Sequence, residues 1–243
     1  MERTTVSAYL RTTQAWCLQL CEKETLDHGI AYVSLRHATL PEACHLREVV
    51  IENETEIAPA LEQTERWFAE RRLRCLRWAP VETQPLVPLQ RVLETKGFRA
   101  KKYTVLALSK WEVPAASGDI RILPARAMRS AFLSTFSVSA EADAFAERLD
   151  DPHLDMFVAV GAAGPVGRCG LFQVGDIARV VEPVACEPGV ERSLVGTALA
   201  LAKRLAYKTV LMQCDSDNHA ALTRYTEYGF SPAGEFVEFD RDA

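Results

Sequence analysis

Tyr225 carries a phenol that can transfer a proton, although a tyrosine on an amphipathic helix, taken alone, is more simply a core or surface residue. The spacing of apolar residues around it predicts a helix from Asn218 to Tyr228. Asn218 is a favourable N-cap for that helix, and Ala221 and Tyr225, four residues apart, share one helix face. Gly229 can adopt the left-handed conformation that ends a helix. A phenol hydroxyl held in this way can donate a proton to a leaving group.

A second stretch that could bind a ligand lies between a predicted strand and a predicted helix. The run Cys186-Glu-Pro-Gly-Val-Glu191 leads into the apolar period of a helix over 192–206. Backbone N–H groups at a helix N-terminus have no partner within the helix and can bind an anionic phosphate. Arg192 and Ser193 could add side-chain contacts to the phosphate oxygens.

The elements that must position these residues follow an unusual order in the second half of the chain. The predicted elements are a strand at 119–124, helices at 125–136 and 140–149, strands at 156–160, 166–174 and 178–186, the helix at 192–206, a strand at 209–214, the helix that carries Tyr225, and a strand at 234–239. GAAGP and Gly175-Asp176 form turns, so the three consecutive strands are expected to pair antiparallel. This order differs from that of a doubly wound fold.

The first half of the chain also predicts mixed α/β structure. Its predicted elements are a helix at 5–27, strands at 30–36 and 45–51, a helix at 57–73, a strand at 75–78, a helix at 87–96 and a strand at 102–108. We place a domain linker at 109–118 (SKWEVPAASG), where Pro, Ala, Ser and Gly replace the periodic apolar residues. Both halves end in a helix stopped by Gly-Phe and followed by an alternating strand, which favours an internal duplication.

Composition and charge limit the classes of function. The chain has 243 residues, 48% of them apolar and 25% charged, as in a globular protein of one large or two small domains. Its formal net charge of −5 argues against a nucleic-acid partner, which requires a concentrated basic surface. Seven scattered cysteines without a CxxC pair predict free thiols in a reducing cytoplasm and no metal site. No signal peptide and no membrane-spanning apolar run are visible, so we expect no membrane partner.

The motif around Tyr225 resembles that of the GNAT superfamily of acyl-CoA-dependent N-acyltransferases. Asn218, Ala221, Tyr225, Gly229 and Phe230 match the family pattern N-x-x-A-x-x-x-Y-x-x-x-G-F at every specified position. The order of elements in the second half is also the order of that fold. The resemblance implies an α/β (α+β) fold with a mixed, mostly antiparallel central sheet flanked by helices, in two tandem GNAT-like domains.

The start of the helix at 192–206 resembles the family's cofactor motif, V-x-P-x-x-[QR]-x-x-G-x-[GA]. Pro188 and Gly196 are in register with it. Glu191 stands where Gln or Arg is usual, and Leu194 replaces the first glycine of the motif. These differences leave two alternatives: the turn binds the pyrophosphate of acetyl-CoA, or it is an ordinary strand-to-helix turn that has lost its ligand.

The resemblance also implies the roles of individual residues. Tyr225 would protonate the coenzyme A thiolate as it leaves, and Glu182 is the candidate general base for the attacking amine, with a surface glutamate as the alternative. The implied cofactor-binding residues are Val184, Ala185 and Cys186 along the pantetheine, Arg192, Ser193, Leu194, Val195, Gly196 and Thr197 at the pyrophosphate, and Asn218. Transfer would be direct, with no metal and no acyl-enzyme.

By resemblance, residues 119–243 form the acetyl-CoA-binding catalytic domain and 1–110 a degenerate copy. Leu93 occupies the position in the first half that Tyr225 occupies in the second, and it cannot donate a proton. The implied reaction moves an acetyl group to a primary amine of a small molecule or a peptide. A noncatalytic module that binds acyl-CoA or a partner protein is the alternative, and a homodimer is left open.

Overall fold

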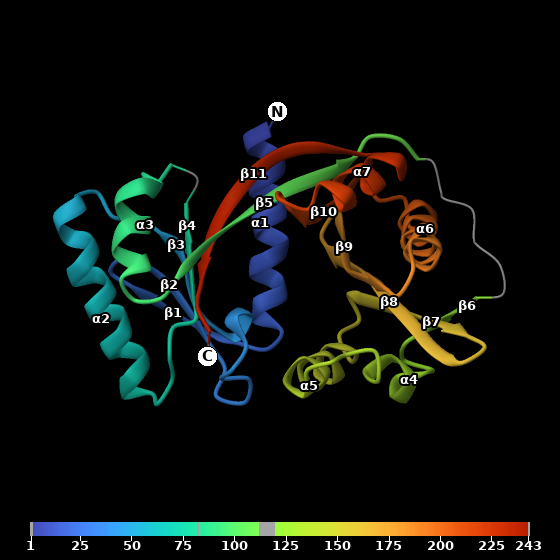
Figure 1. The fold of residues 1–243 in the computed structure, drawn as a ribbon, viewed down its shortest axis with the longest axis horizontal. Helices are drawn as coiled ribbons and strands as arrows, with labels where there is room; N and C mark the ends of the chain where they lie inside the picture. The colour runs from blue at the N-terminus through green and yellow to red at the C-terminus, as the bar shows by residue number, and fades with distance from the viewer. Residues whose placement is uncertain (1, 82, 112–119, 243) are drawn as a thin grey trace. The chain divides into compact units, whose positions relative to one another are not determined.

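Residues 2–81, 83–111 and 120–242 are described by the computed structural model (Figure 1). Their contacts group into two units: unit 1 comprises Met1–Ala15 and Thr104–Glu235, and unit 2 comprises Trp16–Tyr103 and Phe236–Ala243. The units therefore divide the chain differently from the expected ranges of 1–110 and 119–243, because both ends of the first range belong to unit 1 and the end of the second range belongs to unit 2. Most of the expected linker at 109–118 lies outside the described residues.

Unit 1 is a sheet with helices packed on it. Its strands, in spatial order, are β11 (Phe230–Asp240), β5 (Arg99–Leu108), β10 (Thr209–Asp215), β9 (Ile177–Ala185), β8 (Gly164–Val174), β7 (Leu154–Gly161) and β6 (Arg121–Pro124). Its helices are α1 (Glu2–Leu18), α4 (Arg129–Leu133), α5 (Ser139–Arg148), α6 (Pro188–Arg204) and α7 (His219–Glu227). The predicted antiparallel run of three strands is confirmed as β7, β8 and β9.

The core of unit 1 forms where α6 lies against the sheet. Leu194, Ala198, Leu199 and Ala202 recur at helical spacing, are almost fully buried and pack in one cluster with strand residues such as Leu171. After α6 the chain returns to the sheet as β10, which runs parallel to β9. This mixed, mostly antiparallel sheet flanked by helices is the fold class that the sequence predicts.

Unit 2 repeats the same succession of elements. Its strands are, in spatial order, β1 (Glu22–Leu26), β2 (Gly29–Val33), β3 (Cys44–Val49), β4 (Arg77–Pro80), β11 and β5. The short helices η1 (Pro41–Ala43) and η2 (Glu54–Glu56) precede α2 (Ile57–Glu70) and α3 (Leu86–Glu94), which lie side by side in Figure 1. Strand–helix–strand–helix–strand is thus the order of β3 to β5 and of β9 to β11, which supports the predicted duplication.

The predicted helix at 5–27 is wrong in its last third. Helix α1 ends at Leu18, and Glu22–Leu26 pairs antiparallel with β2 from Glu22↔Val33 to Leu26↔Gly29. Glu, Lys and Leu favour helices when they are considered locally. The hairpin ladder with β2 outweighs that preference here.

The two Gly-Phe positions have the predicted role and allow a matched test. Gly97 and Gly229 have φ of 83° and 91°, and Phe98 and Phe230 are each 1% exposed. A Cβ on Gly97 would meet nothing within 4 Å, whereas one on Gly229 would lie 2.3 Å from the Lys110 carbonyl oxygen. We expect Gly97→Ala to cost about 1 kcal/mol of unfolding free energy from the left-handed backbone alone.

Gly229→Ala should cost about 1 kcal/mol more than Gly97→Ala, because the backbone of Lys110 must also move. Urea unfolding of both variants measures the difference. Equal losses would contradict the proposed close contact.

His45 on β3 makes unit 2 sensitive to acid. Its side chain is fully buried and stacks on Tyr32, with ring centroids 4.9 Å apart. Burial lowers the pKa of His45 well below its ordinary value of 6.5, and the charges of Arg47 and Arg77 act in the same direction. The unfolded chain therefore takes up this proton first as the pH falls. The stability that depends on a neutral His45 is complete above its ordinary pKa of 6.5 and is lost as the pH drops from there toward the folded value.

His45→Phe keeps a ring against Tyr32 but cannot titrate. The wild type should lose up to about 1.4 kcal/mol per pH unit more than this variant between roughly pH 6.5 and 5. Urea midpoints measured across that range test the difference. Parallel pH profiles would show that His45 does not contribute.

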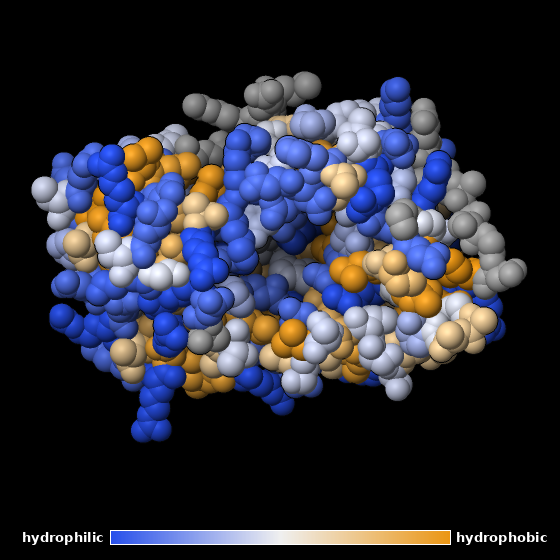
Figure 2. Space-filling model, viewed as in Figure 1, coloured by the Kyte–Doolittle hydropathy of each residue, from blue (hydrophilic) through white to orange (hydrophobic). Residues whose placement is uncertain are grey.

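Hydrophilic residues predominate on the face shown in Figure 2, with apolar residues in smaller patches. Leu35 and Val87 are the most exposed large apolar side chains among the described residues, at 76% and 60%. Scattered exposed apolar residues of this kind are ordinary for a globular protein. No helix in the described part of the chain has the length and apolar character needed to cross a membrane.

Candidate active site

The parallel strands β9 and β10 pair only at their beginnings. Their register covers Thr209–Leu211 against Ile177–Arg179, although β9 continues to Ala185 and β10 to Asp215. No later pair joins these two strands among the described residues. We call the unpaired stretches 180–185 and 212–215 the β9–β10 splay. Backbone groups along them are left for a partner other than the neighbouring strand.

Unit 2 lacks such an opening between its equivalent strands. All four residues of β4 pair with β3, from His45↔Arg77 to Val49↔Pro80. Val81 extends the ladder, since its N–H donates to the Val49 carbonyl oxygen at 3.2 Å. An extended ligand therefore cannot use these strand edges as it could use those of the splay.

A β-bulge marks the start of the splay. Glu182 has φ of 51°, and the register of β9 against β8 shifts there, so that Glu182 and Pro183 oppose Cys169. Such a bulge bends its strand and increases the local twist. Glu48 on β3 also has a positive φ, of 55°, but there the register shift is against β4, and β3 and β4 stay paired on both sides of it.

Tyr225 lies on α7 in the core cluster of unit 1, which also contains residues of β9 and β10. It is 5% exposed and packs with Val180 of β9 and Cys214 of β10 in the core of unit 1. Ala221 is buried on the same helix face, as predicted, and the side chain of Asn218 accepts the Ala221 N–H at 3.0 Å as the predicted N-cap. Burial raises the pKa of Tyr225, and the negative charge of Glu191 raises it further. The phenol therefore retains its proton at neutral pH.

Glu182 is held in place by an arginine that the sequence did not single out. Arg168 on β8 donates to Glu182 Oε2 from Nη2 at 3.0 Å and from Nε at 3.3 Å. The Glu182 side chain is 35% exposed and that of Arg168 is 8% exposed. The carboxylate thus sits at the bulge in a fixed orientation and within reach of solvent.

The start of α6 differs from the prediction. The helix begins at Pro188 rather than at Arg192, and the N–H groups of Val190 and Glu191 already donate to the Glu187 carbonyl oxygen. From Arg192 onward the backbone N–H groups lie inside the helix and bond to carbonyls one turn earlier. The predicted outward N–H donors between 191 and 197 are therefore wrong. A helix presents free donors only in its first turn, and the proline there has none.

The two unusual motif residues have structural partners. Glu191 is 7% exposed and forms a two-point ion pair with Arg224 of α7, with both N–O distances 3.2 Å. Leu194 is fully buried in the core of unit 1, so its side chain points away from solvent. The carboxylate that is unusual for a phosphate site is thus neutralised within the protein.

The other expected cofactor-binding residues are placed in different ways. Cys186 donates its N–H to the Val166 carbonyl oxygen of β8 at 3.0 Å, so that group is already used. Neighbouring residues of a strand direct their backbone groups to opposite sides, so the backbone N–H and C=O of Ala185 point away from β8 and those of Val184 point toward it.

The expected residues on α6 differ in their burial. Val195 is fully buried, Ser193 is buried, and Arg192 is exposed. The roles of Val184, Arg192, Ser193, Val195, Gly196, Thr197 and Asn218 stay predictions.

Sequence reasoning missed Arg168 and Arg224 as members of this site. Arg168 lies 14 positions before Glu182, and Arg224 lies 33 positions after Glu191, so the pairing depends on the folded sheet. The one usable signal was the glutamate at a position where the family motif has Gln or Arg, since a buried carboxylate requires a cation.

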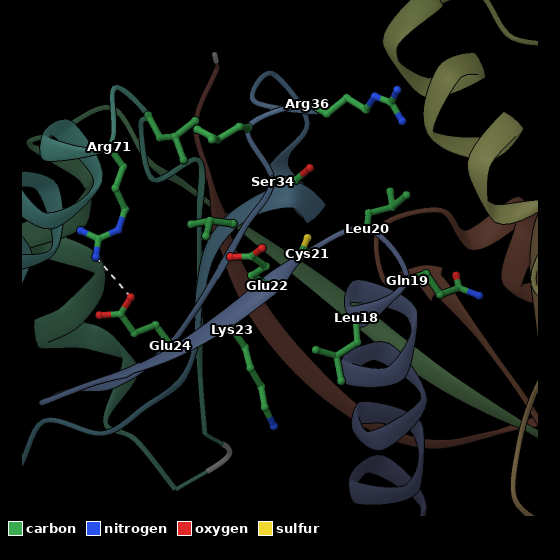
Figure 3. Close-up of a pocket in the computed structure, with 13 residues that line it drawn as sticks. Leu18, Gln19, Leu20, Cys21, Glu22, Lys23, Glu24, Ser34, Arg36 and Arg71 are labelled. Carbon is green, nitrogen blue, oxygen red and sulfur yellow. Dashed lines mark hydrogen bonds and ion pairs between the residues drawn. The ribbon is translucent and has the colours of Figure 1, made fainter.

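Two cavities lie away from Tyr225 and Glu182. One of about 690 Å³ in unit 2 is bordered by the end of α1, by β1 and by the residues after β2, and Arg71 and Glu24 form a 3.2 Å ion pair there (Figure 3). Another of about 460 Å³ in unit 1 is lined by Thr197 and Arg204 of α6 and by residues of β7. Thr197 is the only expected cofactor residue that borders either of these two cavities.

The described residues contain no cluster of His, Cys, Asp or Glu suited to a metal. All seven cysteines are free thiols, and Cys186 is the exposed one.

Comparison with known proteins shows similarity at the level of the fold. No protein-family model and no curated protein matches the chain. A functionally unknown conserved protein from Staphylococcus epidermidis superposes with a TM-score of 0.68 at 12% identity, over 92% of this chain and 95% of that chain. A GCN5-related N-acetyltransferase from Kribbella flavida gives 0.63 at 17% identity, over 100% and 95%. A tandem GNAT protein from the clavulanic acid biosynthesis pathway gives 0.53 at 14% identity, over 88% and 79%.

The chain therefore has the fold of the GNAT acyltransferases, as the resemblance of its motifs implied. More particularly, its repeated element order and its similarity to a tandem GNAT protein give it the tandem form of that fold.

Proposed function

We propose that the protein is an acyl-CoA-dependent N-acyltransferase that moves an acetyl group directly to a primary amine of a small molecule or a peptide. The observation that carries this proposal is the β9–β10 splay together with a protonated Tyr225 in the core cluster that contains residues of both strands. The edge of β9 beyond the bulge can bind an extended pantetheine arm as a further strand would bind. Unit 2 has neither feature, since β3 and β4 stay paired and a fully buried Leu93 replaces the tyrosine. We therefore assign catalysis to unit 1.

In this mechanism the protein contributes two proton-transfer groups. The Tyr225 hydroxyl donates a proton to the sulfur as the thioester bond breaks, and Glu182 accepts a proton from the attacking amine. Glu182 is suited to this task by its partial exposure at the bulge. Acetyl-CoA, when bound, supplies the activated acyl group.

The fit to coenzyme A is unequal along the ligand. The splay suits the thioester and the pantetheine arm. The start of α6 suits the diphosphate poorly, because its N–H groups from Val190 onward are bonded within the helix and Glu191 already pairs with Arg224. The exposed Arg192 is the side chain of this region that we expect to contact a phosphate.

Calorimetric titration with acetyl-CoA and with free coenzyme A tests the proposal, together with an assay of thiol release over a panel of amines. An active acyltransferase should bind acetyl-CoA and release thiol in the presence of at least one amine. Thiol release that requires no amine would instead indicate simple thioester hydrolysis.

The structure of α6 favours one alternative, a noncatalytic module. The early helix start and the internal Glu191–Arg224 pair are what a turn that no longer binds the diphosphate would show. Binding of acetyl-CoA without thiol release across the panel would support that reading. No heat with either ligand would exclude both acyl-CoA proposals.

A further inference from the structure

Arg168 connects three separate parts of unit 1. It projects from β8, and its Nη1 donates to the Thr135 carbonyl oxygen at 2.7 Å. Its guanidinium carbon lies 3.7 Å from the ring centroid of Phe136. Its Nη2 and Nε contact Glu182. The guanidinium is thus fixed by a carbonyl and an aromatic ring on one side while it holds a carboxylate on the other.

Both contacts to Glu182 end on the same oxygen. Nη2 and Nε donate to Oε2, so Arg168 leaves Oε1 uncovered. A carboxylate gripped at one oxygen keeps the lone pairs of the other for a second partner. Because the Glu182 side chain is 35% exposed, a substrate amine can reach it.

The backbone at Glu182 needs such support. A residue with a side chain rarely adopts φ of 51°, and this conformation persists only where the surroundings enforce it. A glutamate at a bulge could otherwise take several side-chain orientations. The fork of Arg168 selects one of them.

We propose that Arg168 is a positioning residue for acyl transfer, which orients Glu182 at the bulge so that Oε1 faces the acceptor amine. This inference rests on the proposed function and adds a residue to it. The segment Thr135–Phe136, which follows α4, becomes part of the same device because it anchors the guanidinium.

A double-mutant cycle on kcat separates positioning from general damage. Arg168→Met should lower kcat about ten- to a hundred-fold, with the KM for acetyl-CoA changed by less than about twofold. In a Glu182→Gln background, Arg168→Met should lower kcat by a further factor of less than about two, because Arg168 acts through that carboxylate. Arg168→Lys keeps the charge but lacks the planar fork, so its kcat should fall between those of the wild type and Arg168→Met.

Arg179→Met is the matched control. Arg179 lies on β9 with its guanidinium 4.8 Å from the ring centroid of Tyr9, and its Nη1 donates to Thr13 Oγ1 at 3.2 Å, so the change removes a comparable cation that lies over a ring and whose hydrogen bond goes to Thr13. Its kcat should stay within about twofold of the wild type. If Arg168→Met does not fold by circular dichroism, Phe136→Leu removes the supporting ring instead. It should lower kcat about threefold, and only where Glu182 is present.

The outcomes separate the two proposals. If the wild type is active and the double variant loses kcat by the product of the two single-variant losses, Arg168 and Glu182 act independently. That result overturns the positioning role but leaves the acyltransferase proposal standing. A higher KM for acetyl-CoA in Arg168→Met, with kcat unchanged, also overturns the positioning role. A wild type without thiol release for any amine overturns the proposed function, and the role of Arg168 with it.

Discussion

Replacing Tyr225 with phenylalanine should lower kcat roughly ten- to a thousand-fold and leave the affinity for acetyl-CoA nearly unchanged. The change removes one oxygen from a side chain that is 5% exposed, so the packing of the ring in the core of unit 1 is retained. What is lost is the proton that burial and the charge of Glu191 keep on the phenol. Steady-state thiol release and calorimetric affinity for acetyl-CoA measure the two effects separately.

Tyr228, the C-cap residue of α7, provides a control next to Tyr225. It is 2% exposed, and its ring meets that of Tyr225 edge-on with centroids 6.1 Å apart. Burial also raises the pKa of Tyr228, so Tyr228→Phe makes the same chemical change in a similar setting. If the two variants lose activity equally, or if Tyr225→Phe loses none, Tyr225 is not the acid.

The fold could be predicted where local signals and long-range pairing agree. Gly97 and Gly229 end their helices with positive φ because no other residue adopts that conformation without strain, and this can be read from the residue type. The turn at Gly175 likewise allowed the antiparallel pairing of β8 and β9 to be predicted. The strand Glu22–Leu26 could not be predicted, because its residues favour a helix locally and only β2 makes them a strand.

The placement of the last strand is also beyond local sequence reasoning. The strands that follow the two Gly-Phe positions look alike in sequence, so nothing local says which sheet each one completes. In the structure β11 lies beside β4, with Phe239↔Trp78 and Asp240↔Arg77 in register, while the neighbour of β10 is β5. Ion pairs of Glu238 and Asp240 on β11 with arginines of β3 and β4, far away in the sequence, accompany this strand placement.

The candidate site shows the same division. The spacing of Asn218, Ala221 and Tyr225 defines one helix face, so the placement of the phenol followed from the sequence. The boundary of α6 was misplaced, although the sequence holds a signal for it, since proline is favoured at the first position of a helix and α6 begins at Pro188. The cation that each glutamate requires could not be predicted, since Arg168 and Arg224 come from other elements.

The end of β11 should prove essential to the stability of unit 2. Glu238 pairs with Arg47 at 2.9 Å and with Arg77 at 3.0 Å, and the Glu238 and Arg47 side chains are only 5% and 4% exposed. Arg77 has a second partner in Asp240 at 2.6 Å. We expect Glu238→Ala to cost about 3–5 kcal/mol, because it leaves the Arg47 guanidinium buried without its carboxylate.

Glu24→Ala is the matched control, because it breaks an ion pair of the same unit at the surface. Arg71 and Glu24 are 3.2 Å apart, and their side chains are 34% and 55% exposed. Water replaces that partner readily, so the loss should stay below about 1 kcal/mol. Urea unfolding followed by tryptophan fluorescence reports on unit 2, where Trp78 is fully buried. Equal losses in the two variants would mean that Arg47 finds compensation elsewhere and that burial does not set the strength of this contact. A larger loss for Glu238→Ala would mean that residues 236–240 of β11 help to hold unit 2 together through charge as well as through strand pairing.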